Sequence, residues 1–568
     1  MVYSEYVMAP YSRQAAMYER SQKKLQKAAG AVEETKKEAQ SFPKNKRLKQ
    51  GRASSNVNSN RLEGAEWGPA KAPKPAQLRS APKTVIEDSL TKVVINSLGA
   101  RIESYKLKAY KETLGKEKSY DMISWNEGAP YPGGVISGGV SDADVSYNLV
   151  AVRGLKEAGK IYRPESDTFS VSYEGILGDG RKVRKIYKFS RNSYLFEVNI
   201  KLSAPPEDGS RLWFEWDYFD HTMGKYSRFS PKALFFMSLL DKKVTTTFPS
   251  KIEDGVPVAG HNEWISIGNK YFTAITIPQA DGVNSKIIKS GKLYRTLAAG
   301  APEYGQFLVY VGPKEYKTLQ RLGHNLYQSV DLGFFAALAH PLLGLIRIFY
   351  SFFGNYGLSI ILLTLLIKAL FLPLTKKSFK SMNAMQKLQP KIQKLREQYK
   401  NDPNRMNQEL IALYKKEGVN PMGGCLPMLI QLPVFLGLYN ALLNSIELRH
   451  APFALWILDL SAPERLYIGG VGIPVMVVIM GISMFVQQWM TPSAMDPTQK
   501  KIMMFMPVMF TFLFLKFPAG LVLYWLTNNI VSIVQQYYIR KERHADATKA
   551  TVIGGVAIFG FAYILTLL

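Results

Sequence analysis

The pattern of apolar residues along the chain changes once, near residue 330. Between residues 84 and 325, apolar side chains alternate with polar ones in short runs such as KVVINSLGARIESYKL and KVRKIYKFSRNSYLFEVNIKL. Beyond residue 330, long apolar runs follow one another and are separated by basic segments. Alternation predicts strands buried on one face, whereas an apolar run of about 20 residues is long enough to cross a bilayer. The sequence therefore predicts a β-rich part followed by a helical membrane part.

The β-rich part, residues 84–325, contains many short strand-like runs separated by turn signals such as GDG and PPEDG. Strands at this spacing are typical of an antiparallel β-sandwich. Trp213, Trp216 and Tyr218 form an aromatic cluster in it, which we interpret as part of the core rather than as a binding face. Residues 1–83 are basic, with few large apolar residues after residue 40. We expect a short remnant of a membrane span followed by a flexible linker there.

Five apolar segments in the second part are predicted to span the membrane. They are residues 356–375, 425–446, 468–490, 502–517 and 520–539. The preceding segment, residues 331–352, is apolar but interrupted by His340, Pro341 and Arg347, which favours a helix lying in the membrane interface. Residues 541–568 are a basic tail followed by an apolar run, which either forms a sixth span or lies on the membrane surface.

The formal net charge of +27 is concentrated in the first 85 residues and in residues 376–416. No helix-turn-helix spacing, zinc-ligand pattern or aromatic RNA-binding signature accompanies this charge, so we expect no specific recognition of nucleic acid. A basic segment between apolar spans is typical of a cytoplasmic loop. Asp402, Pro403 and Gly418 are helix start and stop signals, so residues 376–420 are predicted to form a cytoplasmic helical hairpin. The β-sandwich is then extracytoplasmic.

Polar residues within the predicted spans occur at helical spacing. On the first span Gly357, Thr364, Lys368 and Thr375 are separated by seven, four and seven residues and form a stripe of small or polar residues. On the last, Tyr524, Asn528, Ser532 and Gln535 are separated by four, four and three residues, and Gln431 lies in the second span. Residues three, four or seven apart share one face of a helix. A polar group that faced lipid would be unsatisfied. We therefore expect these faces to meet one another or to line a wet cavity.

Lys368 is the residue that needs most explanation, because a charge at the centre of a span costs about 2.5–3.5 kcal/mol. It could snorkel to the nearer membrane surface. It could pair with an acidic residue, but the five predicted spans contain no Asp or Glu. The remaining interpretation, which we favour, is that Lys368 lies in a water-filled cavity and binds an anionic group that enters it.

Signatures of enzymes are missing from the sequence. It has no phosphate-binding loop, no pair of intramembrane aspartates, no nucleophile elbow and no His-Glu-x-x-His zinc motif. We therefore expect no catalytic residues, no bound metal and no cofactor.

Several long motifs resemble the YidC family of membrane protein insertases. They include FGNYGLSIILLTLLIKALFLPLT, NPMGGCLPMLIQLPVFLGLYNAL and KFPAGLVLYWLTNNIVSIVQQ. The β-rich part resembles the large periplasmic domain of the Gram-negative members. The resemblance implies a multi-domain chain: an extracytoplasmic β-sandwich, then a polytopic helical core of five spans with a cytoplasmic hairpin, in the cell inner membrane. It also implies a first membrane span before the sandwich. The segment VYSEYVMAPYS resembles the outer end of that span.

The family resemblance implies an insertase and folding chaperone that needs no cofactor. Its partners would be nascent membrane proteins, the Sec translocon, the ribosome and the lipid bilayer. The groove cation of the family falls on Lys368, where arginine is usual, and the substrate contacts fall on Thr364, Phe435 and Trp525. Gln431, Tyr524, Asn528 and Ser532 complete the predicted groove.

A transporter that binds an anionic solute at Lys368 is the rival hypothesis. Many transporters contain inverted internal repeats with matching broken helices. We find no convincing repeat in this sequence, which favours the insertase.

Overall fold

The computed structural model describes residues 75–125, 129–221, 233–240, 243–255, 258–279, 284–420, 426–490, 497–541 and 547–567. Most of the predicted linker (residues 1–74) and part of the tail (residues 542–546) lie outside the described residues. The chain divides into two compact units, Met1–Val330 and Asp331–Leu568.

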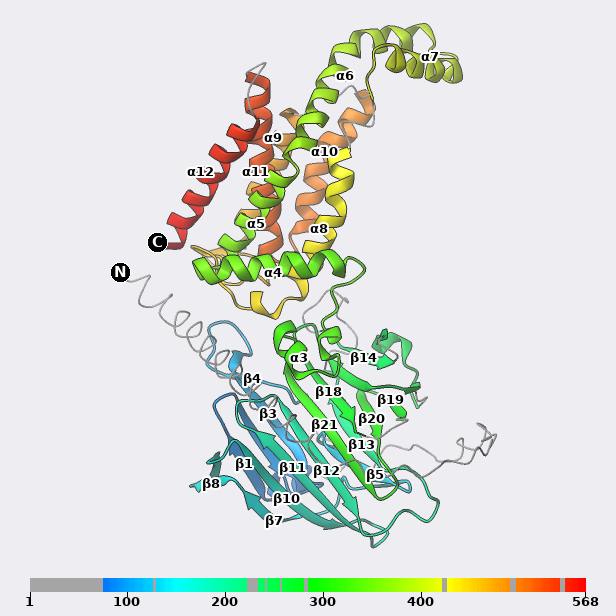
Figure 1. The fold of residues 1–568 in the computed structure, drawn as a ribbon, viewed down its shortest axis with the longest axis vertical. Coiled ribbons are helices and arrows are strands. Elements are labelled where there is room, and N and C mark those ends of the chain that lie inside the picture. Colours follow the sequence, from blue (N-terminus) through cyan, green and yellow to red (C-terminus); the bar gives the residue numbers. More distant parts are fainter. Residues whose placement is uncertain are drawn as a thin grey trace, which may run out of the picture. The chain divides into compact units, whose positions relative to one another are not determined.

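Three β-sheets form the first unit (Figure 1). The nine-stranded sheet has the order β15 (Lys243–Thr247), β14 (Phe235–Leu240), β17 (Trp264–Gly268), β18 (Phe272–Pro278), β21 (Tyr304–Pro313), β12 (Leu195–Leu202), β11 (Lys182–Ser190), β10 (Thr168–Ile176) and β7 (Asn148–Arg153). One six-stranded sheet has the order β4 (Ser119–Asp121), β3 (Arg101–Lys111), β2 (Thr91–Asn96), β1 (Lys83–Glu87), β9 (Ile161–Pro164) and β8 (Leu155–Ala158). The other comprises β16 (Val258–His261), β19 (Asn284–Ser290), β20 (Leu293–Ala299), β13 (Trp213–Phe219), β5 (Gly134–Ser137) and β6 (Val140–Ser141).

Aromatic side chains join the sheets face to face. Tyr105 on β3 stacks on Phe196 of β12 with ring centroids 6.0 Å apart, and Phe214 on β13 stacks on Phe307 of β21 at 5.1 Å. Both six-stranded sheets therefore pack on the nine-stranded one, as the alternating pattern predicts. The predicted antiparallel sandwich is confirmed, with the parallel pairing of β1 and β9 as an exception among the described strands. Trp213 and Trp216 are buried, as expected of core residues.

A buried group of charges links the three sheets. Arg101 at the start of β3 pairs with Asp142 at 2.9 Å, with Asp217 at 3.0 Å and with Glu215, and the second oxygen of Asp142 lies 2.5 Å from Lys185 on β11. All five side chains are at most 1% exposed. Because the Asp142 carboxylate lies between Arg101 and Lys185, its loss would leave Lys185 buried without its ion-pair partner.

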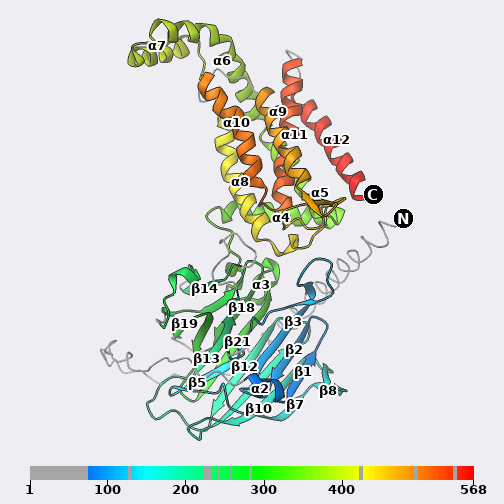
Figure 2. The ribbon, with the colours of Figure 1, turned by 180° about the vertical axis from the view of Figure 1, so that it is seen from behind.

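Helices make up the second unit. They are α4 (Ala336–Phe353), α5 (Tyr356–Leu370), α6 (Leu372–Gln398), α7 (Pro403–Lys416), α8 (Leu426–Asn444), α9 (Val475–Met490), α10 (Pro497–Phe514), α11 (Ala519–Lys541) and α12 (Ala547–Leu567). The helix α4 lies across the ends of α5, α8 and α11, which run roughly side by side (Figures 1 and 2). Large apolar side chains of α4 are exposed at Leu338, Ile348, Phe352 and Phe353, as in an interfacial helix.

The first predicted span is not one helix. It bends by 60° between α5 and α6, at Phe371, so residues 356–375 belong to two helices, and the span predicted there stays a prediction. Pro373 lies in the first turn of α6, and a proline ring clashes with the carbonyl group four residues before it. The break therefore follows from Pro373, which is visible in the sequence but does not affect a prediction based on hydrophobicity alone.

The third predicted span begins later than expected. Residues Leu466–Ile468 and Val471–Ile473 pair as strands β22 and β23 around Gly469 and Gly470, and α9 starts only at Val475. Both glycines have positive φ angles, 58° and 84°, which glycine adopts without strain. Of the predicted span over residues 468–490, only Val475–Met490 is therefore helical.

The predicted basic hairpin is built from α6 and α7. Asp402 caps α7, since its side chain accepts a hydrogen bond from the Arg405 backbone N–H at 3.0 Å, and Pro403 is the first helical residue. Lys391 on α6 donates to Glu417 just after α7 at 2.6 Å. This hydrogen bond and the charge of Lys391 hold the pKa of Glu417 below its usual value.

By length and composition, α4 is long and apolar enough to cross a membrane, and α5 with α6 passes the same test if the bent pair is one span. Among the described residues, shorter apolar helices occupy Val475–Met490, Ile502–Phe514 and Gly554–Leu567. The five spans of the sequence stay a prediction.

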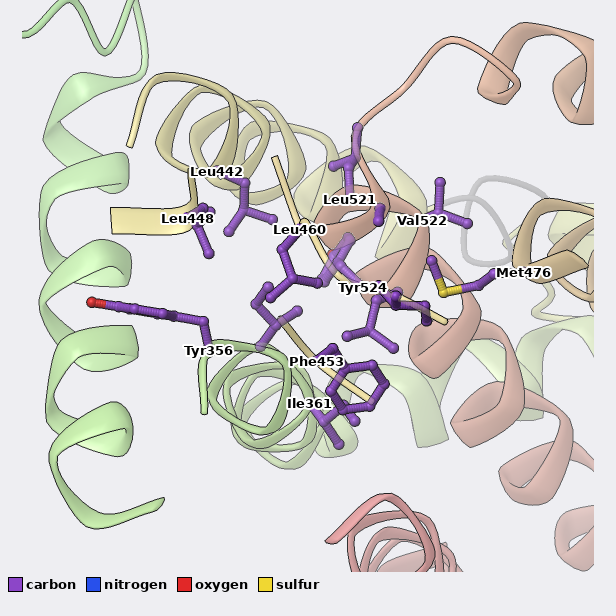
Figure 3. Close-up of a cluster of buried hydrophobic side chains, with 14 of the residues drawn as sticks. Tyr356, Ile361, Leu442, Leu448, Phe453, Leu460, Met476, Leu521, Val522 and Tyr524 are labelled. Carbon is purple, nitrogen blue, oxygen red and sulfur yellow. The ribbon is translucent and has the colours of Figure 1, made fainter. Parts of the chain in front are cut away.

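The core of the second unit lies where α5, α8, α9 and α11 meet the loop that follows α8. Figure 3 shows Ile361, Leu442, Leu460 and Tyr524 converging there. Phe453 from the loop lies directly against Gly357: a Cβ atom on this glycine would come within 2.1 Å of the Phe453 ring. Gly357, the smallest residue of the stripe predicted on this helix, thus allows close packing.

Candidate functional site

Lys368 lies on the last turn of α5 and reaches α11. Its ammonium group donates a hydrogen bond to the Ser532 hydroxyl at 2.7 Å, and that hydroxyl donates to the Asn528 carbonyl oxygen at 2.8 Å. Ser532 is buried, and Lys368 is half-buried. The ammonium group is therefore held inside the helix bundle by a neutral partner.

A second polar contact joins α8 to α11. The Gln431 side-chain amide donates to the Asn528 side-chain oxygen at 2.8 Å and lies 3.4 Å from the Tyr524 hydroxyl. Tyr524, Asn528 and Ser532 are four residues apart, and all three meet the polar side chains of α5 or α8. The helical spacing in the sequence predicted this common face.

Aromatic side chains border the polar residues. The Phe435 ring on α8 meets the Trp525 ring on α11 edge-on, with centroids 4.7 Å apart, and lies 6.3 Å from Tyr524. Trp525 also contacts Phe514 of α10, at 5.3 Å. An apolar wall formed by three helices thus stands next to the polar face of α11.

Thr364 is oriented differently from the other predicted site residues. Its hydroxyl donates to the Ile360 carbonyl oxygen of its own helix at 2.7 Å, and the residue is 1% exposed. A threonine whose hydroxyl is satisfied in this way offers little to a ligand. Thr375, expected on the same face, lies beyond the bend and donates to the Phe371 carbonyl oxygen.

One buried amide of α11 was absent from the predicted site. The Asn529 side chain donates to the Ser483 hydroxyl of α9 at 3.0 Å, and both residues are buried. Because Asn529 directly follows Asn528, it points to a different helix. An intramembrane amide always needs a partner, and that rule could have identified Asn529.

No acidic residue occurs in α5, α8, α9, α10 or α11, and no ion pair of Lys368 is found within the described part of the chain. The described residues also include no group of three His, Cys, Asp or Glu side chains that could hold a metal. The site therefore combines one cation with hydroxyl and amide groups that can donate and accept hydrogen bonds. Such a site can bind an anionic or polar group without covalent chemistry.

Family comparisons cover nearly all of the described chain. Residues 348–547 match the family described as 60Kd inner membrane protein, and residues 83–345 match the YidC periplasmic domain. The membrane protein insertase YidC of Syntrophus aciditrophicus is 40% identical over 80% of this chain and 84% of its own length. The membrane protein insertase YidC of Geotalea daltonii is 38% identical over 86% of this chain and 92% of its own length.

A solved structure titled as an active YidC insertase with the first transmembrane domain resolved aligns with 82% of this chain and 96% of its own. Its identity is 21% and its TM-score 0.36, a likeness too low to support an argument about the fold.

Proposed function

Because this chain belongs to the YidC family of membrane protein insertases, we propose that it inserts nascent proteins into the inner membrane through the polar face around Lys368. The observation that carries the proposal is the contact of Lys368 with Ser532 in a helix bundle that lacks acidic residues. A cation held by a neutral hydroxyl can exchange that partner for a carboxylate at little cost.

In this mechanism an acidic or polar part of the incoming segment approaches Lys368. The carboxylate takes the place of Ser532, and Gln431 and Asn528 offer further hydrogen bonds once they release each other. The apolar part of the segment slides along Phe435 and Trp525 into lipid. No cofactor takes part, because the free energy of transfer from water to lipid drives the apolar segment.

The orientation we propose follows from charge. The hairpin of α6 and α7 carries many lysines, and its cytoplasmic placement obeys the positive-inside rule. The β-sandwich then lies in the periplasm, in keeping with the family match of residues 83–345. From the family resemblance we also propose the Sec translocon and the ribosome as partners, and a role as a folding chaperone.

The test replaces Lys368 in cells depleted of the native protein. For Lys368→Ala we expect insertion of a small single-span protein with an acidic tail to fall by roughly tenfold, which corresponds to about 1.4 kcal/mol. Lys368→Arg keeps the charge and should insert nearly as well as the native protein. Protease protection of the substrate's tail measures insertion in each strain.

Lys516→Ala is the matched control, since Lys516 is exposed after the end of α10 and should be dispensable. Normal insertion by Lys368→Ala would contradict the role of the cation. Normal insertion after complete depletion would contradict the insertase function itself. Loss of uptake of an anionic solute, with insertion intact, would favour the transporter.

A further inference from the structure

The helix α12 (Ala547–Leu567) has no part in the proposed groove. From Thr551 to Leu568 the sequence contains no charged residue. As a helix, these 18 residues would be about 27 Å long at 1.5 Å per residue, close to the thickness of a bilayer's hydrocarbon core. Length and composition therefore permit a further span.

Small residues bring α12 into close contact with the bundle. A Cβ atom on Gly554 would lie 2.8 Å from Val534 of α11, and one on Gly555 would lie 3.3 Å from Leu365 of α5. Ala562, about two turns after Gly555, is 5% exposed and belongs to the main apolar core. Small residues at such positions allow membrane helices to approach closely.

The contacts fix the direction of α12. Near its start it touches Val534 and Leu365, which lie late in α11 and α5. Further along, the rings of Phe559 and Tyr563 meet Phe353 at the end of α4, with centroids 5.1 and 6.4 Å away. The helix thus runs antiparallel to both α5 and α11, and its last turns reach the level of α4 (Figures 1 and 2).

The opposite face of α12 is apolar. Val556, Phe561, Ile564 and Leu567 are between 57% and 70% exposed. A helix that lay on the membrane surface would present a polar face to water. In the described part of α12, the exposed face is apolar instead. Lipid is the environment that such a face fits.

We propose that α12 is a further membrane span, which returns from the side of the α6–α7 hairpin to the side of α4, and that it is the resident occupant of the face formed by α5 and α11. This face is then closed to other membrane proteins within the same molecule. Since α5 carries Lys368, α12 also holds the cation-bearing helix against the bundle from outside.

Cysteine labelling in intact cells tests the topology. In a Cys425→Ser background, Leu567→Cys should react with a membrane-impermeant maleimide from the same side as Lys156→Cys in the β-sandwich. Gln393→Cys on α6 should react only after permeabilisation. If Leu567→Cys reacts only together with Gln393→Cys, the proposed span is refuted.

Oxidative crosslinking tests the packing in the full chain. The pair Leu365→Cys and Gly555→Cys should form a disulfide with high yield. Adding Gly554→Leu should lower this yield several-fold, because the new side chain meets Val534. Gly560→Leu is the matched control, since nothing lies within 4 Å of the position of its Cβ atom, and it should leave the yield unchanged.

A missing crosslink, or equal effects of the two leucines, would overturn the proposed contact. Neither experiment measures insertion, so its outcome is independent of whether the proposed function holds.

Discussion

At the residue scale, the partner of Lys368 is as informative as the charge itself. The ammonium group is bound by one serine hydroxyl, a contact that keeps the side chain extended toward α11 without neutralising it. An arginine at this position would present a rigid fork of five donors, whereas a lysine is a compact charge that accepts many geometries. We therefore expect the environment, more than the identity of the cation, to decide how well it is presented.

Replacing Ser532 with alanine tests this view. The change removes one hydrogen bond to a charged group, a kind of bond that contributes about 1.5–3 kcal/mol to stability, and frees Lys368 to adopt other rotamers. We expect insertion of acidic-tailed substrates to fall several-fold, by less than in Lys368→Ala, when measured by protease protection.

Ser359→Ala on α5 is its control. The Ser359 hydroxyl is buried and donates to the Asn355 carbonyl oxygen of its own chain segment at 2.8 Å, remote from the cation in sequence and face. Equal losses in the two variants would indicate a general effect of removing a buried hydroxyl.

At the scale of elements, breaks and close contacts decide the shape of the helical unit. The bend at Phe371 directs α6 away from the bundle, and the β22–β23 turn shortens α9. Gly357 lets Phe453 pack on α5. Each feature depends on a proline or glycine, so local sequence carries the signal, but hydrophobic length alone predicts uninterrupted spans.

The substitution Gly357→Ala should destabilise the helical unit. Its methyl group would meet the Phe453 ring, and overpacking of this kind costs about 1–3 kcal/mol. This cost exceeds the stabilisation expected from the higher helix propensity of alanine. Thermal unfolding of the detergent-purified protein measures the change. Gly344→Ala on α4, where nothing lies within 4 Å, should be neutral or slightly stabilising, and equal effects would contradict the packing argument.

At the scale of the whole molecule, the two units use charge differently. The sandwich buries three acids together with two bases, whereas the five helices of the proposed groove contain no acid at all. Burial raises the pKa of Asp142, but Lys185 and Arg101 outweigh it, so that its pKa is lower than usual. Burial and the nearby Glu215 raise the pKa of Asp217 well above its usual value.

Acidification should therefore weaken the sandwich through Asp142. A lowered pKa contributes stability that is present above the unfolded-state pKa, about 3.9, and is lost as the pH falls through the folded-state value. We expect Asp142→Asn to cost about 3–5 kcal/mol at neutral pH, since it removes the carboxylate that pairs with the buried Lys185 and one of the acidic partners of Arg101. The difference in unfolding free energy between Asp142→Asn and the native protein should become smaller in acid. Tryptophan fluorescence during thermal unfolding measures this difference.

Asp217→Asn is the matched control. Its carboxyl group favours the protonated form, so a neutral amide should cost much less at neutral pH. A larger loss for Asp217→Asn than for Asp142→Asn would contradict the assignment of charges.

The sequence by itself determined the order of the two parts, the strand-rich first unit, the capped hairpin and the common face of Tyr524, Asn528 and Ser532. These features depend on local periodicity and on neighbours within one element, which the order of residues states directly. Only the tertiary structure decided that Ser532 is the partner of Lys368, that Asn529 turns to Ser483 and that α12 runs antiparallel to α5. Contacts between helices depend on how their faces are rotated toward one another, and that rotation is set by packing of the whole unit.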